Sequence, residues 1–167
     1  MYYLKLFLSY SLFGFIMEST LFKITQSKKY SGIFYGPITA VYGVGVISIE
    51  LLNKYIFKKI KTNKIIKYLI EFIILTIVLS FIEYLGGNIL KLLFDIDMWD
   101  YSSNFMHFGK YICLQNSIIW GVLGTIYIHI FKKFTDKLLN KITNKETYLF
   151  TALFLIDLII VLITKLN

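Results

Sequence analysis

The feature that most constrains this chain is a series of long apolar runs with short polar segments between them. An α-helix needs roughly 20 mostly apolar residues to cross the hydrocarbon core of a bilayer, which is about 30 Å thick. Five runs come close to this length: about Tyr3–Phe22, Phe34–Leu52, Ile66–Gly86, Tyr111–Phe131 and Tyr148–Thr164. We therefore predict an all-α membrane protein in which residues 1–167 form a single domain, a bundle of about five transmembrane helices.

Composition excludes the main alternative, a soluble fold. Hydrophobic residues make up 57% of the chain, whereas soluble domains are about 45–50% apolar. The net charge of +8 comes from lysines, because the chain has no arginine. Arginine is the side chain that most often reads bases and binds phosphates with two hydrogen bonds, so we expect no nucleic-acid partner. Lysines between apolar runs indicate contact with anionic membrane lipids instead.

The lysines also predict the orientation of the chain, because cytoplasmic loops carry an excess of positive residues. In a five-span chain, two basic loops fall on the same side: they contain Lys54, Lys58, Lys59, Lys61 and Lys64, and Lys132, Lys133, Lys137, Lys141 and Lys145. A chain without arginine and rich in lysine, isoleucine and asparagine also fits an AT-rich bacterial genome. We therefore expect a multi-pass protein of the bacterial plasma membrane with a cytoplasmic N-terminus. The loop with Lys23, Lys28 and Lys29 then lies outside unless Phe34–Leu52 is re-entrant, and the sequence leaves both arrangements open.

The stretch from Glu83 to Gly121 departs from this simple pattern. Its apolar run carries a carboxylate and is expected to break at Gly86-Gly87. An amphipathic segment follows, and we predict that it forms a short helix at the membrane interface. It leads into the loop Trp99-Asp100-Tyr101-Ser102, which is expected between the third and fourth transmembrane helices.

Four carboxylates are candidate functional groups. A charged side chain inside a span costs roughly 3 kcal/mol on insertion scales, so it is retained mainly where it pairs, takes up a proton or contacts water. Glu18 and Glu83 lie toward the outer ends of two runs, Asp157 lies within the last run, and Asp100 lies in the loop. We predict that they form a substrate-binding site in the outer half of the bundle. The structural alternative is that they only join helices or, for Asp100, cap a turn.

Further polar and aromatic residues complete the predicted substrate-binding site: Gly36, Pro37, Tyr42, Trp99, Tyr101 and Ser102. Glycine and proline can break a helix and present backbone groups to a ligand, although close helix packing is the alternative. Trp and Tyr also suit the membrane–water boundary. Of the two histidines, we expect His107 in a solvated loop and His129 near the interface.

A weak internal repeat links the two halves of the chain. The first copy is Glu18, then Tyr30-Ser31, then Tyr42-Gly43-Val44-Gly45. The second copy is Glu83, then Tyr101-Ser102, then Trp120-Gly121-Val122-Leu123-Gly124. Because the intervening lengths differ, chance remains the alternative to a structural repeat of the kind seen in transporters.

The sequence contains no motif for a catalytic or metal site. It has no GxxxxGK[ST] phosphate loop, no HExxH and no GxSxG. The single cysteine, Cys113, cannot form an internal disulfide and lacks the partners of a cysteine metal site. We therefore expect a protein that is not an enzyme, with no catalytic residue, no metal and no cofactor.

Several motifs resemble those of one family of small bacterial membrane proteins, the ABC-transporter permeases of the CmpB type. They are Tyr10-Ser11-Leu12-Phe13-Gly14-Phe15-Ile16-Met17-Glu18, Gly36-Pro37, Tyr42-Gly43-Val44-Gly45, Glu83-Tyr84-Leu85-Gly86, Trp99-Asp100-Tyr101-Ser102, Gly109-Lys110-Tyr111-Ile112-Cys113-Leu114 and Trp120-Gly121. The resemblance runs from about Tyr10 to Gly124, and Asp157 resembles an acidic residue late in the last helix.

The resemblance implies a permease-like subunit with a multi-pass membrane fold, and it names no substrate. Its expected partners are membrane lipids and either a separate ATPase subunit or further copies of the chain. Two other functions stay open: a lipid-binding or lipid-modifying membrane protein, and a scaffold or regulator of a membrane complex.

Overall fold

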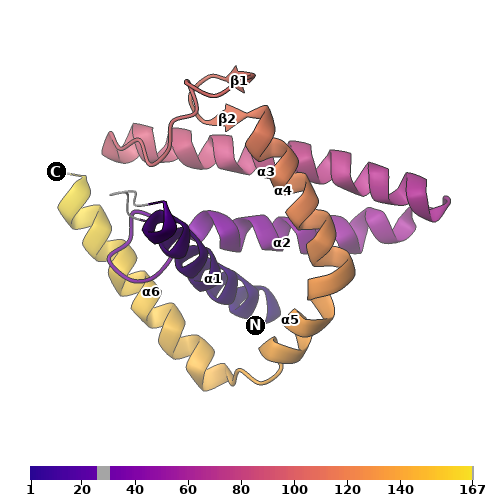
Figure 1. Cartoon of the computed structure of the whole chain (residues 1–167). Helices are drawn as coiled ribbons and strands as arrows, with labels where there is room; N and C mark the ends of the chain where they lie inside the picture. Colours follow the sequence, from indigo (N-terminus) through magenta and orange to yellow (C-terminus); the bar gives the residue numbers. More distant parts are fainter. Residues whose placement is uncertain (26–30, 167) are drawn as a thin grey trace. The chain divides into compact units, whose positions relative to one another are not determined.

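The computed structural model describes residues 1–25 and 31–166, and most of these residues are helical (Figure 1). The helices are α1 (Tyr2–Ile24), α2 (Ala40–Tyr55), the 3₁₀ turn η1 (Phe57–Lys59), α3 (Lys64–Phe94), α4 (Leu114–Ile126), the π-helical turn η2 (Tyr127–Phe131), α5 (Lys132–Leu139) and α6 (Asn144–Lys165). Two short antiparallel strands, β1 (His107–Phe108) and β2 (Ile112–Cys113), lie in the loop before α4.

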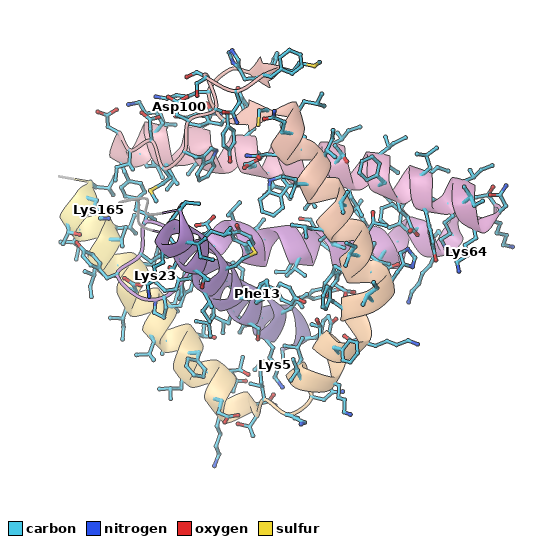
Figure 2. All side chains as sticks on the ribbon, viewed as in Figure 1. Lys5, Phe13, Lys23, Lys64, Asp100 and Lys165 are labelled. Atoms are coloured by element: carbon cyan, nitrogen blue, oxygen red, sulfur yellow. The ribbon has the colours of Figure 1, made fainter. Side chains whose placement is uncertain are left out.

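The prediction of about five transmembrane helices is confirmed. Within the described part of the chain, five helical segments are long and apolar enough to cross a membrane: Tyr2–Ile24, Ala40–Lys59, Lys64–Phe94, Leu114–Leu139 and Asn144–Lys165. Large apolar side chains are exposed along all of them (Figure 2). In a membrane protein these side chains face lipid, which is as apolar as they are.

The described residues group into two compact units, and the chain passes between the units within α2 and within α5. Unit 1 comprises Met1–Val44 and Leu138–Asn167, and unit 2 comprises Gly45–Lys137. Whether residues 1–167 act as a single domain stays a prediction.

In unit 1, α1 and α6 pack together and support the segment that leads into α2. The ring of Phe154 on α6 contacts the rings of Phe7 and Phe34, with centroids 5.4 and 5.3 Å apart. Lys5 Nζ donates a hydrogen bond of 2.6 Å to the Ile142 carbonyl. The helix expected from Phe34 begins only at Ala40, because proline disfavours helical backbone in the residue before it, here Gly36.

In unit 2, α3 and α4 form the main helix pair, and α3 corrects one prediction. The expected break at Gly86-Gly87 is absent, since α3 continues to Phe94 and ends at Asp95, which has a positive φ of 54°. The predicted interfacial helix is therefore the last part of α3. The physical reason is packing: a Cβ on Gly87 would lie 2.5 Å from the Tyr111 ring, so this glycine admits a neighbouring side chain instead of ending the helix.

Side chains also fix where the helices begin. Asn63 Oδ1 accepts a hydrogen bond of 2.9 Å from the Ile66 N–H at the start of α3, where the first backbone donors have no partner within the helix. Lys64 therefore begins α3, and Asp100 lies in the loop near the other end of this helix (Figure 2). At the start of α6, Thr143 and Glu146 form a capping box.

Candidate functional site

The loop after α3 and the helix α4 both contact the carboxylate of Glu83. Glu83 lies on α3 and is 5% exposed. Its Oε1 accepts a hydrogen bond of 2.9 Å from Tyr101 Oη, and its Oε2 accepts one of 3.0 Å from Trp120 Nε1. Burial, and next the nearby Glu83 carboxylate, raise the pKa of Tyr101 above its ordinary value, so the hydroxyl stays protonated and remains a donor. The structure thus brings two predicted site residues together and adds Trp120.

A second carboxylate with the same kind of partners lies in unit 1. Glu18 Oε1 accepts a hydrogen bond of 3.0 Å from Tyr42 Oη, and Glu18 Oε2 accepts one of 2.7 Å from Ser31 Oγ. The Ser31 hydroxyl is also 2.6 Å from the buried Thr39 hydroxyl. We call Glu18 with Ser31 and Tyr42 the first centre, and Glu83 with Tyr101 and Trp120 the second centre.

The two centres share a local arrangement that gives the sequence repeat a structural basis. In each, the carboxylate contacts the aromatic side chain that directly precedes a glycine, in Tyr42-Gly43 and in Trp120-Gly121. The loop donor differs in position, because Ser31 serves in the first centre and Tyr101 in the second. Tyr30, which the repeat pairs with Tyr101, lies outside the described residues.

The glycine of each pair packs against the helix that carries the carboxylate. A Cβ on Gly43 or on Gly121 would lie under 3.0 Å from side chains 7 and 11 residues before the glutamate. These side chains are Ser11 and Phe7 in unit 1, and Thr76 and Phe72 in unit 2. The same spacing in both units shows that the repeat is one of three-dimensional packing as well as of sequence.

Asp157 anchors the irregular segment before α2. Its Oδ1 accepts a hydrogen bond of 3.1 Å from the Tyr35 N–H, and its Oδ2 accepts one of 2.8 Å from the Gly36 N–H. The carboxylate therefore binds the backbone beside Pro37, which is itself exposed. The structure joins the predicted site residues Asp157 and Gly36, and the contact connects α6 with the irregular segment before α2.

Asp100 has the geometry of a turn cap. Its Oδ1 accepts a hydrogen bond of 2.9 Å from the Ser102 N–H, and its Oδ2 is 3.7 Å from Lys110 Nζ. The hydrogen bonds from Ser102 lower the pKa of Asp100. The neighbouring Trp99 ring meets the Tyr111 ring edge-on, with centroids 6.2 Å apart. Glu18 and Asp157 lie in unit 1 and Glu83 and Asp100 in unit 2, so one site for all four stays a prediction.

Asp97, which the sequence did not single out, is the centre of the loop's ion pairs. Its Oδ2 lies 2.8 Å from Lys110 Nζ and 3.4 Å from Lys91 Nζ, and its Oδ1 accepts a hydrogen bond of 2.5 Å from Tyr111 Oη. Hydrogen bonds from Lys110 and then Tyr111 lower the pKa of Asp97 to about 2. The ionised carboxylate therefore connects the end of α3, through Lys91, with the far part of the loop, through Lys110 and Tyr111.

Strong acid should loosen this loop. Because the folded-state pKa of Asp97 lies below its ordinary value of 3.8, its contribution to stability is complete above about pH 4 and is lost as the pH falls through about 2. We expect tryptophan fluorescence, which includes Trp99, to be constant from pH 7 to pH 4 and to change below about pH 3. The D97N variant should lack this transition. A transition that persists in D97N would contradict the assignment.

The sequence reasoning missed two buried carboxylates in unit 2, Glu50 and Glu71. They lie within the second and third apolar runs, so the criterion that selected Glu18 and Glu83 applies to them equally. His107, as expected, is exposed in the loop. Within residues 1–25 and 31–166, no three His, Cys, Asp or Glu side chains lie close enough together to hold a metal ion.

Comparison with known proteins extends the resemblance to almost the whole chain. Residues 5–165 match the family described as "Putative ABC-transporter type IV". Comparisons with curated proteins and with solved structures found no match. The matched region includes both centres and nearly all of the five long helices. The chain is therefore a multi-pass membrane protein that belongs to this ABC-transporter type IV family.

Proposed function

We propose that the chain is the membrane subunit of an ABC-type transporter of the bacterial plasma membrane and that it works with a separate ATPase subunit. The family and the five long apolar helices support the membrane role. The sequence has no phosphate-binding loop, so ATP hydrolysis would come from a partner. The N-terminus is cytoplasmic in this proposal, which places most lysines on the inner side.

The observation that carries the proposal is the repeated carboxylate centre. Each glutamate has both oxygens oriented by neutral donors, at 2.7–3.0 Å. An ionised carboxylate has no hydrogen to donate and can only accept hydrogen bonds. With its glutamate ionised, each centre would therefore take a substrate group that donates hydrogen bonds or carries a positive charge. The proposed substrate contacts are Glu18 and Tyr42 in the first centre, and Glu83, Tyr101 and Trp120 in the second centre. A substrate contact from the exposed Pro37, or from Trp99, stays a prediction.

Native mass spectrometry of the protein, purified from its own host in mild detergent, tests the partner. We expect a complex that contains this chain together with a protein carrying a phosphate-binding loop, and vanadate-sensitive ATP hydrolysis in the same fraction. A homo-oligomer that carries only lipid, without ATP hydrolysis, would contradict the proposal and favour lipid handling.

A further inference from the structure

Two buried carboxylates of unit 2 lie outside both centres and contact the π-turn and the start of α5. Glu50 on α2 is 6% exposed, and Glu71 on α3 is 1% exposed. An ionised carboxylate in such surroundings is strongly unfavourable unless it is paired, so its partners decide whether it carries a charge. The partners of Glu50 and Glu71 differ in kind.

Glu50 forms an ion pair with a lysine. Lys132 Nζ lies 2.6 Å from Glu50 Oε1 and 2.7 Å from Oε2, and Tyr127 Oη donates a further hydrogen bond of 2.7 Å to Oε1. Lys132 is also 3.4 Å from Asp136 Oδ2. The buried Glu50 carboxylate thus has a lysine as its ion-pair partner.

The partner of Glu71 is a histidine. His129 Nε2 lies 2.6 Å from Glu71 Oε2, and the imidazole ring packs against Tyr68 with centroids 4.3 Å apart. The His129 side chain is 30% exposed, which gives protons a way in. Histidine is the side chain whose charge ordinarily changes between about pH 5 and 8.

The Glu71–His129 pair can hold one shared proton in either of two forms. The pair is neutral overall as carboxylate with imidazolium, and it is neutral as carboxylic acid with imidazole. Loss of that proton leaves an ionised carboxylate, almost fully buried, beside a neutral ring. The geometry therefore favours the state in which one proton is bound between the two side chains.

The π-helical turn makes both sets of contacts possible. Side chains five positions apart point about 140° away from each other on an α-helix, which advances about 100° per residue. A π-turn instead closes residue i onto i+5 and is found often at functional sites. The turn Tyr127–Phe131 thus places Tyr127 and Lys132 on one face, toward Glu50, and leaves His129 directed at Glu71.

We propose that Glu71 and His129 form a proton-binding site at this end of unit 2, positioned by the π-turn. The charged and titratable groups on the elements that pack here include Glu50 on α2, Lys64 and Tyr68 on α3, Tyr127 on the π-turn, and Lys132 and Asp136 on α5. Release of the proton weakens the contact between α3 and the π-turn. The proposal goes beyond the transport function and does not depend on it.

Imidazole NMR on protein with labelled histidine tests the site directly. The chain has two histidines, so H107Q leaves His129 as the single signal. We expect this signal to titrate, and its midpoint to move to lower pH by at least one unit when E71Q is added, because the carboxylate that stabilises imidazolium is gone. A midpoint that E71Q does not move overturns the proposal.

Thermal melting in detergent between pH 5.5 and 8.5 gives an independent readout. In this proposal the folded pair keeps a proton that the unfolded chain releases, so stability falls as the pH rises through the release range, by about 3 to 5 °C per pH unit for one proton. H129Q should lose this slope, and H107Q, the matched control, should keep it. Equal slopes in H129Q and wild type would overturn the proposal. The NMR result decides alone if H129Q does not fold.

Discussion

Alanine at Gly43 or at Gly121 is expected to destabilise the protein markedly, whereas alanine at Gly45 is not. A Cβ on Gly43 would lie under 3.0 Å from the Ser11 hydroxyl and from both the ring and the backbone carbonyl of Phe7. Because a backbone atom cannot rotate away, the helices must separate. Overpacking of this kind costs about 1–3 kcal/mol, which for a chain of this size is a fall of roughly 3 to 10 °C in melting temperature.

Gly45 is the matched control because it lies two residues along the same helix. A Cβ there would meet only Leu79 Cδ2, at 3.6 Å, which is an ordinary contact. Alanine also favours helix over glycine by about 1 kcal/mol, so G45A should melt at or slightly above the wild-type temperature. Thermal melting of the three variants in one detergent measures the difference. Similar melting temperatures for G43A and G45A would contradict the close helix approach seen at the first centre.

The architecture could be predicted from the sequence because a transmembrane helix is a signal of length and composition. The helix boundaries were harder to predict, because a glycine in an apolar run has more than one structural role. Gly86-Gly87 predicted a break, but Gly87 gives room to the Tyr111 ring within a continuous α3. A helical glycine can mark either a break or a close contact, and only the neighbour that packs there decides between them.

The candidate site could be predicted in part, because a carboxylate within an apolar run is visible in the sequence. Glu18 and Glu83 stand out as carboxylates in apolar runs, and the repeat indicated that the residues around them correspond. The hydrogen bonds from Ser31 and Trp120 depend on how distant segments fold together, so no local pattern predicts them. The π-turn, with the pairing of Glu71 and His129, depends on packing in the same way.

Replacing either Glu18 or Glu83 with glutamine is expected to abolish function without removing the protein from the membrane. Glutamine has the shape of glutamate and still accepts a hydrogen bond through its carbonyl oxygen. In E83Q that oxygen can face Trp120 Nε1, while the new amide group donates to the Tyr101 hydroxyl, which can accept. In E18Q both partners are hydroxyl groups. The substitutions therefore replace the acidic group with a neutral amide of the same shape and can keep hydrogen bonds to the same partners.

E146Q is the matched control for loss of a carboxylate. Glu146 is exposed at the start of α6 and accepts hydrogen bonds from Thr143 in the capping box, where glutamine serves as well as glutamate. This variant should retain both expression and function. Its comparison with E18Q and E83Q separates a general effect of lost charge from a specific effect at the two centres.

The most direct measurement is a growth competition in the native host after deletion of its own copy of the gene, under a condition where the deletion slows growth. Strains carrying wild type, E18Q, E83Q and E146Q compete in one culture, and immunoblots of membranes report the amount of each protein. We predict that the E18Q and E83Q strains are lost from the culture as fast as the deletion strain, although their membranes contain the wild-type amount of the protein. The E146Q strain should grow as well as the wild type. Wild-type growth of E18Q and E83Q, or loss of both proteins from the membrane, would contradict a functional role for the two centres.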